Sequence, residues 1–513
     1  MNHYDRLPYE SNPFSDTHPR NLSMLGKLFR LPVAAPEQCR VLELGCASGG
    51  NLIPMAWHLP QSEFVGIDLE AAQVAEGQRL ISELGLGNIT LAQGDIMELG
   101  DELGQFDYII AHGVFSWVPE AVRQGMFALY RRLLKPSGIG YISYNTRPGW
   151  HVRGMVREML LYHTRGIDDP LECLNRAHDF IEMYAQTLKG QPGSLSKHLL
   201  LELESLKRAH PSYLYHEYLE ANNQPLLASE FIEQAQAHGL KYLCECQLEG
   251  MFPSHLGPLA EAFLDGIEEG ARHEQYLDFF NHRTFRQSLL LPSEAEPDYD
   301  IDLGRMEEWS CAANLAPPRK LELRKAGAQT FSTLDGKEVP VELPLVRAML
   351  AILYQHYPSA LPLSELAEMG REQVQQAHGK KRAIIDDNWH GEFFNLYANC
   401  LLHLTERPLH YNNTPTARPR LTALARAWVE HGAENIPTIW HQPLNTDSFS
   451  LQVLHSLDGE HDREQLLAKL LADVQSGKLE LPGVSRDQDK LQLQLAANLE
   501  RLLRLFAQNG LLE

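Results

Sequence analysis

From residue 40 onward, short apolar runs alternate with stretches in which apolar residues recur at helical spacing. The apolar runs predict strands over 40–44, 63–68, 88–93, 106–113 and 139–145. The helical patterns between them cover 50–58, 71–84 and 119–134. This alternation is typical of βαβ units, so we expect an α/β domain with five parallel strands joined by helical crossovers.

The alternation stops after residue 145 and resumes near residue 228. Three helices are predicted between these points, over 154–163, 171–188 and 194–207. The resumed pattern predicts a helix over 228–240 and an antiparallel pair of strands over 241–248 and 285–292. We interpret this as one sheet with a helical insertion at about 150–228, in a first domain spanning 1–292. Since ligands bind at the carboxyl edge of a parallel sheet, the insertion is placed to act as a lid; an independent helical domain is the alternative.

The acidic stretch 293–302 predicts a linker, and the chain beyond it is mainly helical. Helices are expected over 341–358, 363–370, 393–411, 449–457, 463–474 and 491–513, with the proline-bearing stretch 436–447 as a connection. Both halves show a helix, a turn, a short capped helix and a long helix. This order favours two small winged-helix-like units, at 303–436 and 437–513.

Charge and composition limit the classes of partner. The 513 residues carry a net charge of −22, which argues against broad attraction to nucleic acid or anionic lipid, even for winged-helix-like units. We read the basic cluster at 380–382 as a solvated loop. No apolar run approaches the ~18 residues of a spanning helix, and no signal segment opens the chain, so we expect a cytoplasmic protein with no membrane insertion and leave its oligomeric state open.

The cysteines point away from metal binding. Seven are scattered through the chain without a CxxC pair, so we predict no metal site. Cys244 and Cys246 alternate within a predicted strand and therefore share one face. We expect that face to be buried.

The candidate chemistry begins at VLELGCASGGN, residues 41–51, directly after the first strand. A glycine-rich turn between strand and helix lets a ligand approach the backbone, and the free N–H groups favour negative charge. Asp68 ends the second strand, where a carboxylate can accept from both ribose hydroxyls. Asp95 ends the third strand and, with the backbone of Ile96, can pair with adenine. Glu43 lies inside the first strand, an unusual place for a carboxylate unless it faces a ligand or a backbone donor.

Taken together, these residues resemble the E/DxGxGxG loop, ribose acid and adenine acid of the class I S-adenosylmethionine-dependent methyltransferases. The resemblance implies a Rossmann-like sheet, S-adenosylmethionine as cofactor, and methyl transfer as the activity. Ala47 departs from the motif at its middle glycine. The cofactor-binding residues implied by the resemblance are Glu43, Gly45, Cys46, Ala47, Gly49, Asn51, Asp68, Leu69, Gln73, Gly94, Asp95, Ile96, His112, Gly113 and Val114.

Aromatic and polar residues follow the fourth and fifth strands, where the cofactor's methyl group should point. Methyl transfer requires alignment of the nucleophile and exclusion of water, and ring faces attract a sulfonium or ammonium. Packing of the sheet edge is the alternative for some of these rings. An Asn/Asp-Pro-Pro-Tyr motif is absent and the nearest cysteine is Cys173, which disfavours amide, adenine and pyrimidine-carbon acceptors. The residues expected to cluster here are His112, Phe115, Trp117, Tyr144, Asn145, Trp150 and His151.

The insertion ends with SYLYHEYLEANNQPL, in which Glu217 stands among three tyrosines and His216. Glu217 can hold a lysine ammonium or take its proton, because the amine must be neutral to attack. A satisfied surface carboxylate is the alternative. The predicted catalytic residues are Trp117, Tyr144, Trp150, Glu217 and Tyr218.

A narrower resemblance rests on YDxxPYxSxPFxxTHP, LELGCAxGGN, HGVFSWVP, SYNxxPGWH, HEYL and FNHRTFRQSLL. Together they are similar to bacterial methyltransferases with a regulatory domain, which include rickettsial protein-lysine methyltransferases acting on outer-membrane proteins. The resemblance implies that Tyr9, Ser11 and His18 close over the cofactor and that the acceptor is a protein lysine. Two alternatives stay open: a small-molecule methyltransferase acting under the lid, and a cofactor-binding interaction scaffold without catalysis.

Overall fold

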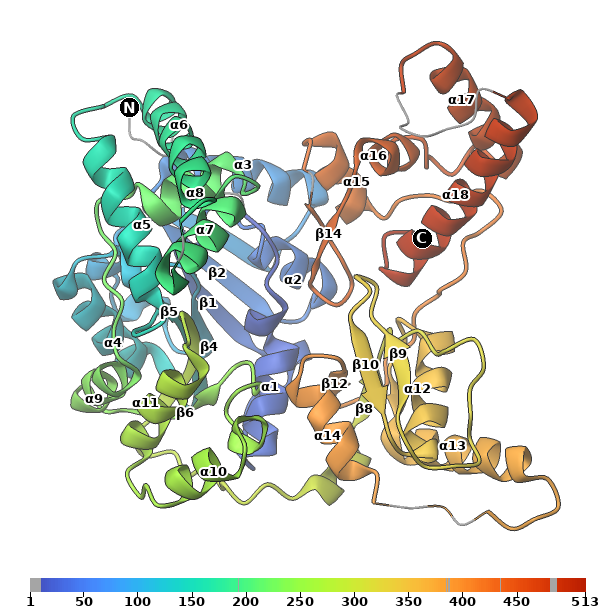
Figure 1. Cartoon of the computed structure of the whole chain (residues 1–513), viewed down its shortest axis with the longest axis horizontal. Helices are drawn as coiled ribbons and strands as arrows, with labels where there is room; N and C mark the ends of the chain where they lie inside the picture. Colours follow the sequence, from blue (N-terminus) through green and yellow to red (C-terminus); the bar gives the residue numbers. More distant parts are fainter. Residues whose placement is uncertain (1–10, 192, 384, 386–387, 434, 480–486) are drawn as a thin grey trace.

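The computed structural model describes residues 11–513 apart from 192, 384, 386–387, 434 and 480–486. Its largest element is a seven-stranded sheet (Figure 1). The strands are β1 (Arg40–Leu44), β2 (Glu63–Asp68), β3 (Ile89–Gln93), β4 (Phe106–Ala111), β5 (Leu134–Asn145), β6 (Leu240–Glu245) and β7 (Phe285–Pro292). They follow the order β3-β2-β1-β4-β5-β7-β6, with the first five parallel and β7 antiparallel to both β5 and β6. The Rossmann-like fold and the single interrupted sheet are confirmed.

Helices cover both faces of the sheet. On one face, α1 (Pro19–Leu28), α2 (Leu52–His58) and α3 (Ala71–Leu84) share an apolar cluster with Val41 of β1. On the other, α4 (Glu120–Leu133) and α9 (Ala228–Ala237) share a cluster with Leu42. Adjacent residues of a strand point to opposite faces, so β1 contributes to both cores and is fully enclosed. The carboxyl ends of the parallel strands are left as the open edge.

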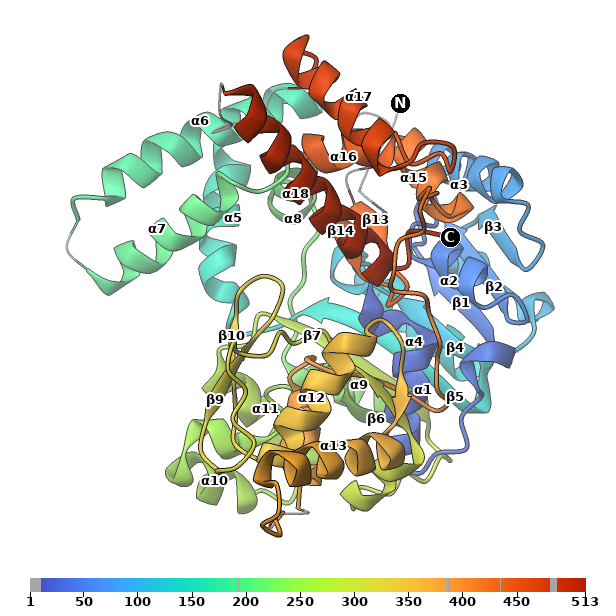
Figure 2. The same ribbon diagram turned by 90° about the vertical axis from the view of Figure 1, so that its right-hand side faces the viewer.

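The insertion consists of α5 (Trp150–His163), α6 (Pro170–Leu188), α7 (Ser194–Leu206) and α8 (Pro211–Tyr218). It has an apolar core of its own, which includes Val156, Ile181 and Leu203. Figure 2 shows α6 and α7 extending away from the sheet, whereas α8 lies nearer to it. The helix α8 was not expected from the sequence. After it, α9, α10 (Pro258–Asp265) and α11 (Gly270–Asn281) accompany the two antiparallel strands.

The chain after β7 forms two further groups of elements (Figure 1). The first group comprises β8 (Ser310–Ala312), β9 (Gln329–Ser332), β10 (Glu338–Val341), α12 (Pro344–His356), β11 (Leu361–Pro362), α13 (Leu363–His378), α14 (His390–Ala398) and β12 (His403–Thr405). The second comprises α15 (Ala423–Glu430), β13 (Asn435–Pro437), β14 (Pro443–Asn445), α16 (Ser448–Leu454), α17 (Arg463–Gln475) and α18 (Gln488–Gln508). Asp447, Asp462 and Asp487 cap the N-termini of α16, α17 and α18. Each side chain accepts from backbone N–H groups of the first helical turn, which have no partner within the helix.

Two expectations for this half were wrong. The helix expected over 393–411 ends at Ala398, because Cys400 adopts a left-handed backbone (φ 57°) and residues 403–405 pair with β8. The stretch 436–447, expected as a plain connection, instead lies in the antiparallel hairpin β13–β14. This hairpin brings a tight turn, residues 438–442, toward the methyltransferase sheet.

The remaining expectations concern the cysteines, metal sites and membrane-spanning helices. Cys244 and Cys246 are both buried, as expected. Among the residues that the structure describes, no group of three or more His, Cys, Asp or Glu side chains is arranged to hold a metal ion. Within the same residues, no helix is long and apolar enough to cross a membrane.

Candidate active site

The turn after β1 has the backbone that a close ligand approach requires. Gly45 and Gly49 have φ of +74° and +79°, and a Cβ on Gly45 would lie 2.4 Å from Cγ2 of Val114. Ala47 holds the motif's middle position with φ of 48°, a left-handed conformation that alanine adopts at a cost. The backbone N–H of Ala47 donates to Asp68 Oδ2 at 2.7 Å. The turn is thereby tied to the end of β2.

Glu43 is a buried carboxylate that only half satisfies its hydrogen bonds. Its Oε1 accepts from Asn51 Nδ2 at 2.8 Å, whereas Oε2 is buried and has no hydrogen-bond partner among the described residues. Burial raises the pKa of Glu43 to about 8, and the nearby Asp68 adds to the shift, while the Asn51 hydrogen bond opposes it. A buried polar oxygen without a partner is costly, and a cation beside it would favour the ionised carboxylate, so this site fits a cationic ligand group such as the ammonium of S-adenosylmethionine.

A cavity of about 240 Å³ lies over the turn and the strand ends. Of the predicted cofactor-binding residues, it collects Ser11, Glu43, Gly45, Cys46, Ala47, Asn51, Asp68, Leu69, Gln73, His112, Gly113 and Val114. Trp117 and Glu217, two of the predicted catalytic residues, line the same cavity. The turn, the end of β2, the end of β4 and the insertion therefore meet around one space, and the binding roles of these residues stay predictions.

Besides His18, four predicted cofactor residues of the described chain do not line this cavity: Gly49, Gly94, Asp95 and Ile96. Gly49 packs closely under the turn, where a Cβ would lie 2.8 Å from Cδ1 of Leu91. Asp95 is exposed, and its Oδ1 accepts from the backbone N–H of Met97 at 2.9 Å. An exposed carboxylate at this strand end is accessible to an adenine, and that role stays a prediction. Tyr9 lies outside the described residues.

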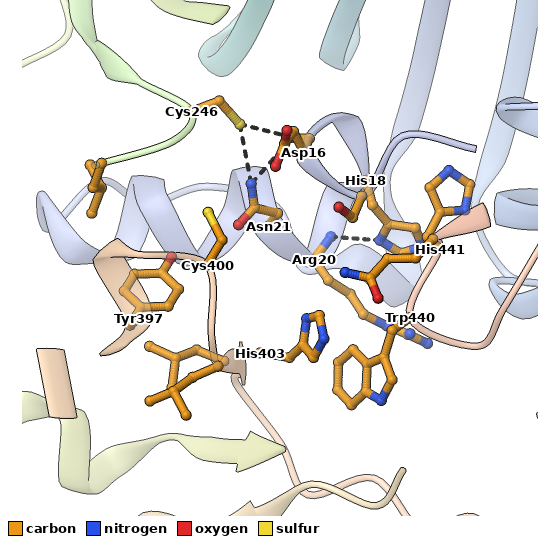
Figure 3. A pocket seen from close by; sticks show the side chains of 15 residues that line it. Asp16, His18, Arg20, Asn21, Cys246, Tyr397, Cys400, His403, Trp440 and His441 are labelled. Carbon is orange, nitrogen blue, oxygen red and sulfur yellow. Dashed lines mark hydrogen bonds between the residues drawn. The ribbon is translucent and has the colours of Figure 1, made fainter. Parts of the chain in front are cut away.

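His18 does not lie over the cofactor cavity, which corrects its expected place. It caps α1 by accepting from the backbone N–H of Arg20 at 3.1 Å, and it is buried. Its ring faces His441, with ring centroids 4.9 Å apart. Both histidines line a second, smaller cavity of about 80 Å³, bounded by α1, the end of β6, α14, β12 and the β13–β14 turn (Figure 3).

Three predicted catalytic residues are held in packing positions instead. Tyr144 is buried in the core and stacks on Phe231, with ring centroids 4.1 Å apart. Trp150 is buried at the start of α5, under the guanidinium of Arg153. The Tyr218 hydroxyl donates to Glu202 within the insertion. The Tyr144 ring packs against α9 and the Tyr218 hydroxyl bonds to α7, and none of the three side chains lines the cofactor cavity. Phe115, expected in the same cluster, is likewise a core residue.

Glu217 of α8 is half-buried at the cavity wall. Burial raises the pKa of its carboxyl to about 7, against the opposing effects of Arg153 and His216. A carboxylate that titrates near neutral pH can exchange a proton with an amine at that pH. Its position on α8 brings this group to the wall of the same cavity as the turn that follows β1.

Sequence reasoning missed several wall residues. Phe14 stacks on His112 with centroids 3.8 Å apart, so the segment before α1 covers the end of β4. Phe14 stands in the run YDxxPYxSxPF, and its aromatic type was the available signal. The other wall residues not named beforehand as binding or catalytic are Asn12, Glu70, Val118, His216 and Glu220.

Comparisons with known proteins agree with this geometry. A "Methyltransferase domain" model matches residues 41–138, a "Predicted methyltransferase regulatory domain" model matches 210–291, and a "PKMT, C-terminal winged helix domain" model matches 417–511. An uncharacterized protein of Rickettsia prowazekii, RP028, is 34% identical over 240 residues, which cover 47% of this chain and 96% of that protein. The chain belongs to the class I S-adenosylmethionine-dependent methyltransferases that carry a methyltransferase regulatory domain.

Two further relatives match nearly the whole chain. The uncharacterized protein RP789 of R. prowazekii is 29% identical over 525 residues, covering 100% of this chain and 94% of that protein. The structure of PKMT2 from Rickettsia typhi in complex with AdoHcy superposes with a TM-score of 0.84 at 26% identity, covering 98% of this chain and 100% of that one. The cofactor of this methyltransferase is S-adenosylmethionine. The winged-helix model includes α15, which the sequence-based division assigned to the preceding unit; that division stays a prediction.

Proposed function

We propose that this methyltransferase N-methylates lysine side chains of a protein substrate. The observation that carries the proposal is Glu217, a carboxylate with a pKa of about 7 on the wall of the cofactor cavity. A lysine ammonium is attracted to such a carboxylate and must lose a proton before its nitrogen can attack. The similarity to PKMT2, a protein-lysine methyltransferase by its name, supports the same acceptor.

A second support is the surface around the cavity. The cofactor cavity shares Ser11, Asn12 and Gln73 with an adjoining hollow of about 430 Å³, whose far wall includes Trp428 and Asn435 of the winged-helix unit. A path that continues from the cavity onto the C-terminal elements suits an extended polypeptide better than an enclosed metabolite. The net charge of −22 favours a basic substrate segment by long-range attraction.

In this mechanism, the chain positions the acceptor and handles its proton. When bound, S-adenosylmethionine supplies an electrophilic methyl group: the amine lone pair forms the C–N bond while the S–C bond breaks and its electrons stay on sulfur. Glu217 accepts the ammonium proton at a carboxylate oxygen and releases it to water. Phe14 and Trp117 form aromatic walls that exclude water and attract the cationic amine. Glu43 and Asp68 would hold the cofactor's ammonium and ribose.

The proposal is tested by incubating the full chain with S-adenosylmethionine labelled in its methyl group and a bacterial lysate. We expect label in the protein fraction, and methylated lysine after acid hydrolysis. An excess of S-adenosylhomocysteine should suppress the signal. Label only in small molecules would overturn the proposal in favour of a metabolite acceptor. Cofactor binding without any labelled product would favour the non-catalytic scaffold.

A further inference from the structure

The hairpin β13–β14 of the winged-helix unit reaches the cofactor site through one histidine. His441 lies in its turn, is buried, and has a left-handed backbone (φ 58°). Its Nε2 is 2.8 Å from Oδ1 of Asn51, the residue before α2. Asn51 Nδ2 in turn donates to Glu43 Oε1 at 2.8 Å. Two buried hydrogen bonds in series therefore connect His441 through Asn51 to the Glu43 carboxyl group of the cofactor cavity, although His441 and Asn51 are 390 positions apart in the sequence.

The hydrogen bonds around Asn51 fix the direction of its amide. Its Oδ1 accepts from the backbone N–H of Phe14 at 3.0 Å and from His441 Nε2, whereas the Thr17 hydroxyl lies within hydrogen-bond distance of both amide atoms and does not distinguish them. With Oδ1 on the side of these donors, Nδ2 is directed at Glu43. A reversed amide would place its oxygen against Glu43, and in the ionised form that the cofactor's ammonium favours, two acceptors would then face one another. The donors on Oδ1 therefore determine which group Glu43 meets.

His441 donates this hydrogen bond in its neutral form. Burial lowers its pKa well below the ordinary value, with His58 and Arg20 adding to the effect. Because Asn51 presents an acceptor, the network assigns the proton to Nε2 and leaves Nδ1 as an acceptor. That Nδ1 is buried and has no hydrogen-bond partner among the described residues. Among the described residues, the hydrogen bond to Asn51 is therefore the one that orients the His441 ring.

The turn that carries His441 is held from several sides (Figure 3). The indole N–H of Trp440 donates to the Pro358 carbonyl at 3.1 Å, and its ring stacks on His403 at 4.5 Å. A guanidinium N–H of Arg20 donates to the Ile439 carbonyl at 3.3 Å. These contacts come from the segment between α12 and α13, from β12 and from α1. The position of His441 thus depends on the C-terminal elements being docked on the methyltransferase domain.

We propose that the winged-helix unit completes the cofactor site, with His441 as a positioning residue that acts on Glu43 through Asn51. The unit then has a part in methyl transfer besides any part in substrate recruitment. Undocking of the hairpin would remove one of the donors to Asn51 Oδ1 and leave the Phe14 N–H, so the amide would be held less firmly and cofactor affinity would fall without a change in any residue that touches the cofactor. The inference rests on S-adenosylmethionine being the cofactor and is independent of the identity of the methyl acceptor.

The test compares cofactor affinities of full-length variants by isothermal titration calorimetry. We expect His441→Ala to raise the Kd for S-adenosylmethionine about tenfold, equivalent to about 1.4 kcal/mol. Asn51→Ala should weaken binding at least as much, and the double variant should bind no more weakly than Asn51→Ala alone. His441→Gln, whose amide nitrogen can replace Nε2, should recover most of the affinity, whereas the shorter His441→Asn should not.

His431→Ala is the matched control for affinity. His431 belongs to the same unit and also contacts the methyltransferase domain, with Nε2 3.0 Å from Glu83, but that pair is exposed, and His431 lines the adjoining hollow and not the cofactor cavity. Its Kd should stay within twofold of the wild type. The proposal is overturned if His441→Ala binds the cofactor with wild-type affinity, or if the losses in affinity of His441→Ala and Asn51→Ala multiply in the double variant. It is also overturned if His431→Ala weakens binding as much as His441→Ala does. If His441→Ala fails to fold, equal affinities of the Gln and Asn variants would overturn it.

Discussion

The backbone N–H of Ala47 donates to Asp68 Oδ2 at 2.7 Å, which ties the glycine turn after β1 to the carboxylate that ends β2. The other oxygen of Asp68 accepts from the N–H of Glu70 at 2.9 Å. Each carboxylate oxygen can accept a second hydrogen bond, and Asp68 lines the cofactor cavity. The carboxylate is therefore held in one orientation while it keeps acceptor capacity for a ribose.

Replacing Asp68 should weaken cofactor binding strongly. Asp68→Ala removes charge-assisted hydrogen bonds of about 1.5–3 kcal/mol each, so we expect the Kd to rise by at least about tenfold in calorimetric titrations. Asp101→Ala is a suitable control, because Asp101 is exposed and pairs with Arg132 away from the cavity. Unchanged affinity in Asp68→Ala would contradict the ribose role.

Substitutions at Gly45 and Ala47 of the turn should differ in their effect. Gly45→Ala places a Cβ 2.4 Å from Val114 Cγ2 at a φ of +74°, so we expect a loss of about 1–3 kcal/mol in unfolding free energy and weaker cofactor binding. Ala47→Gly relieves a left-handed alanine and should change stability by less than about 1 kcal/mol, with binding retained. Urea unfolding and titration of both variants would measure this. Equal losses would show that the backbone conformation of the turn is not the deciding factor.

The sequence predicted helix and strand bounds best where a single hydrophobic periodicity determines the element. Strands β1 and β2 match the expected runs residue for residue, because a buried strand between turn residues has few alternative readings. The helix expected over 393–411 was wrong, since pairing of residues 403–405 with β8 is a tertiary contact that local periodicity does not record. The same holds for α8, a short helix of mixed polarity whose buried partners lie in the insertion.

Site residues followed a similar rule. Those on the turn and strand ends, such as Gly45, Asp68 and His112, line the cavity, because the topology of a parallel sheet brings strand ends together, and their binding roles stay predictions. Tyr144 and Trp150 were not, because a residue type and a strand end do not determine which way a ring turns. The role of His441 depends on packing between distant units, which no motif in the sequence encodes.

Glu217→Gln should separate acceptor chemistry from cofactor binding. The pKa of Glu217 is raised to about 7, so wild-type kcat on a lysine peptide should rise with pH as the carboxyl ionises near that value. In the glutamine variant, we expect kcat to fall about 100-fold, the inflection near pH 7 to vanish, and the cofactor Kd to stay within twofold. Glu158→Gln, on an exposed position of α5, is the control and should leave both unchanged. A retained inflection in Glu217→Gln would assign the ionisation to another group.

Glu43 should make the cofactor-free protein less stable as the pH rises. Its pKa is raised from an ordinary value of 4.5 to about 8, so its favourable contribution is complete below about pH 4.5 and is lost as the pH rises through about 8. The buried His18, His112 and His441, whose pKa values are lowered, act below about pH 6.5, which leaves pH 6.5–8 as the informative window.

In that window, the unfolding free energy of the wild type should fall relative to that of Glu43→Gln, by at most about 1.4 kcal/mol per pH unit for one proton. The amide keeps an oxygen acceptor for Asn51 and cannot ionise, so comparison with this variant cancels other groups that titrate near pH 7, including Glu217. Saturating S-adenosylmethionine should abolish the difference in slope, because its ammonium stabilises the Glu43 carboxylate. Urea unfolding at several pH values, with and without cofactor, measures both effects. Parallel pH profiles for the wild type and Glu43→Gln would show that Glu43 does not change its ionisation between pH 6.5 and 8 in the folded, cofactor-free protein, which would contradict its raised pKa.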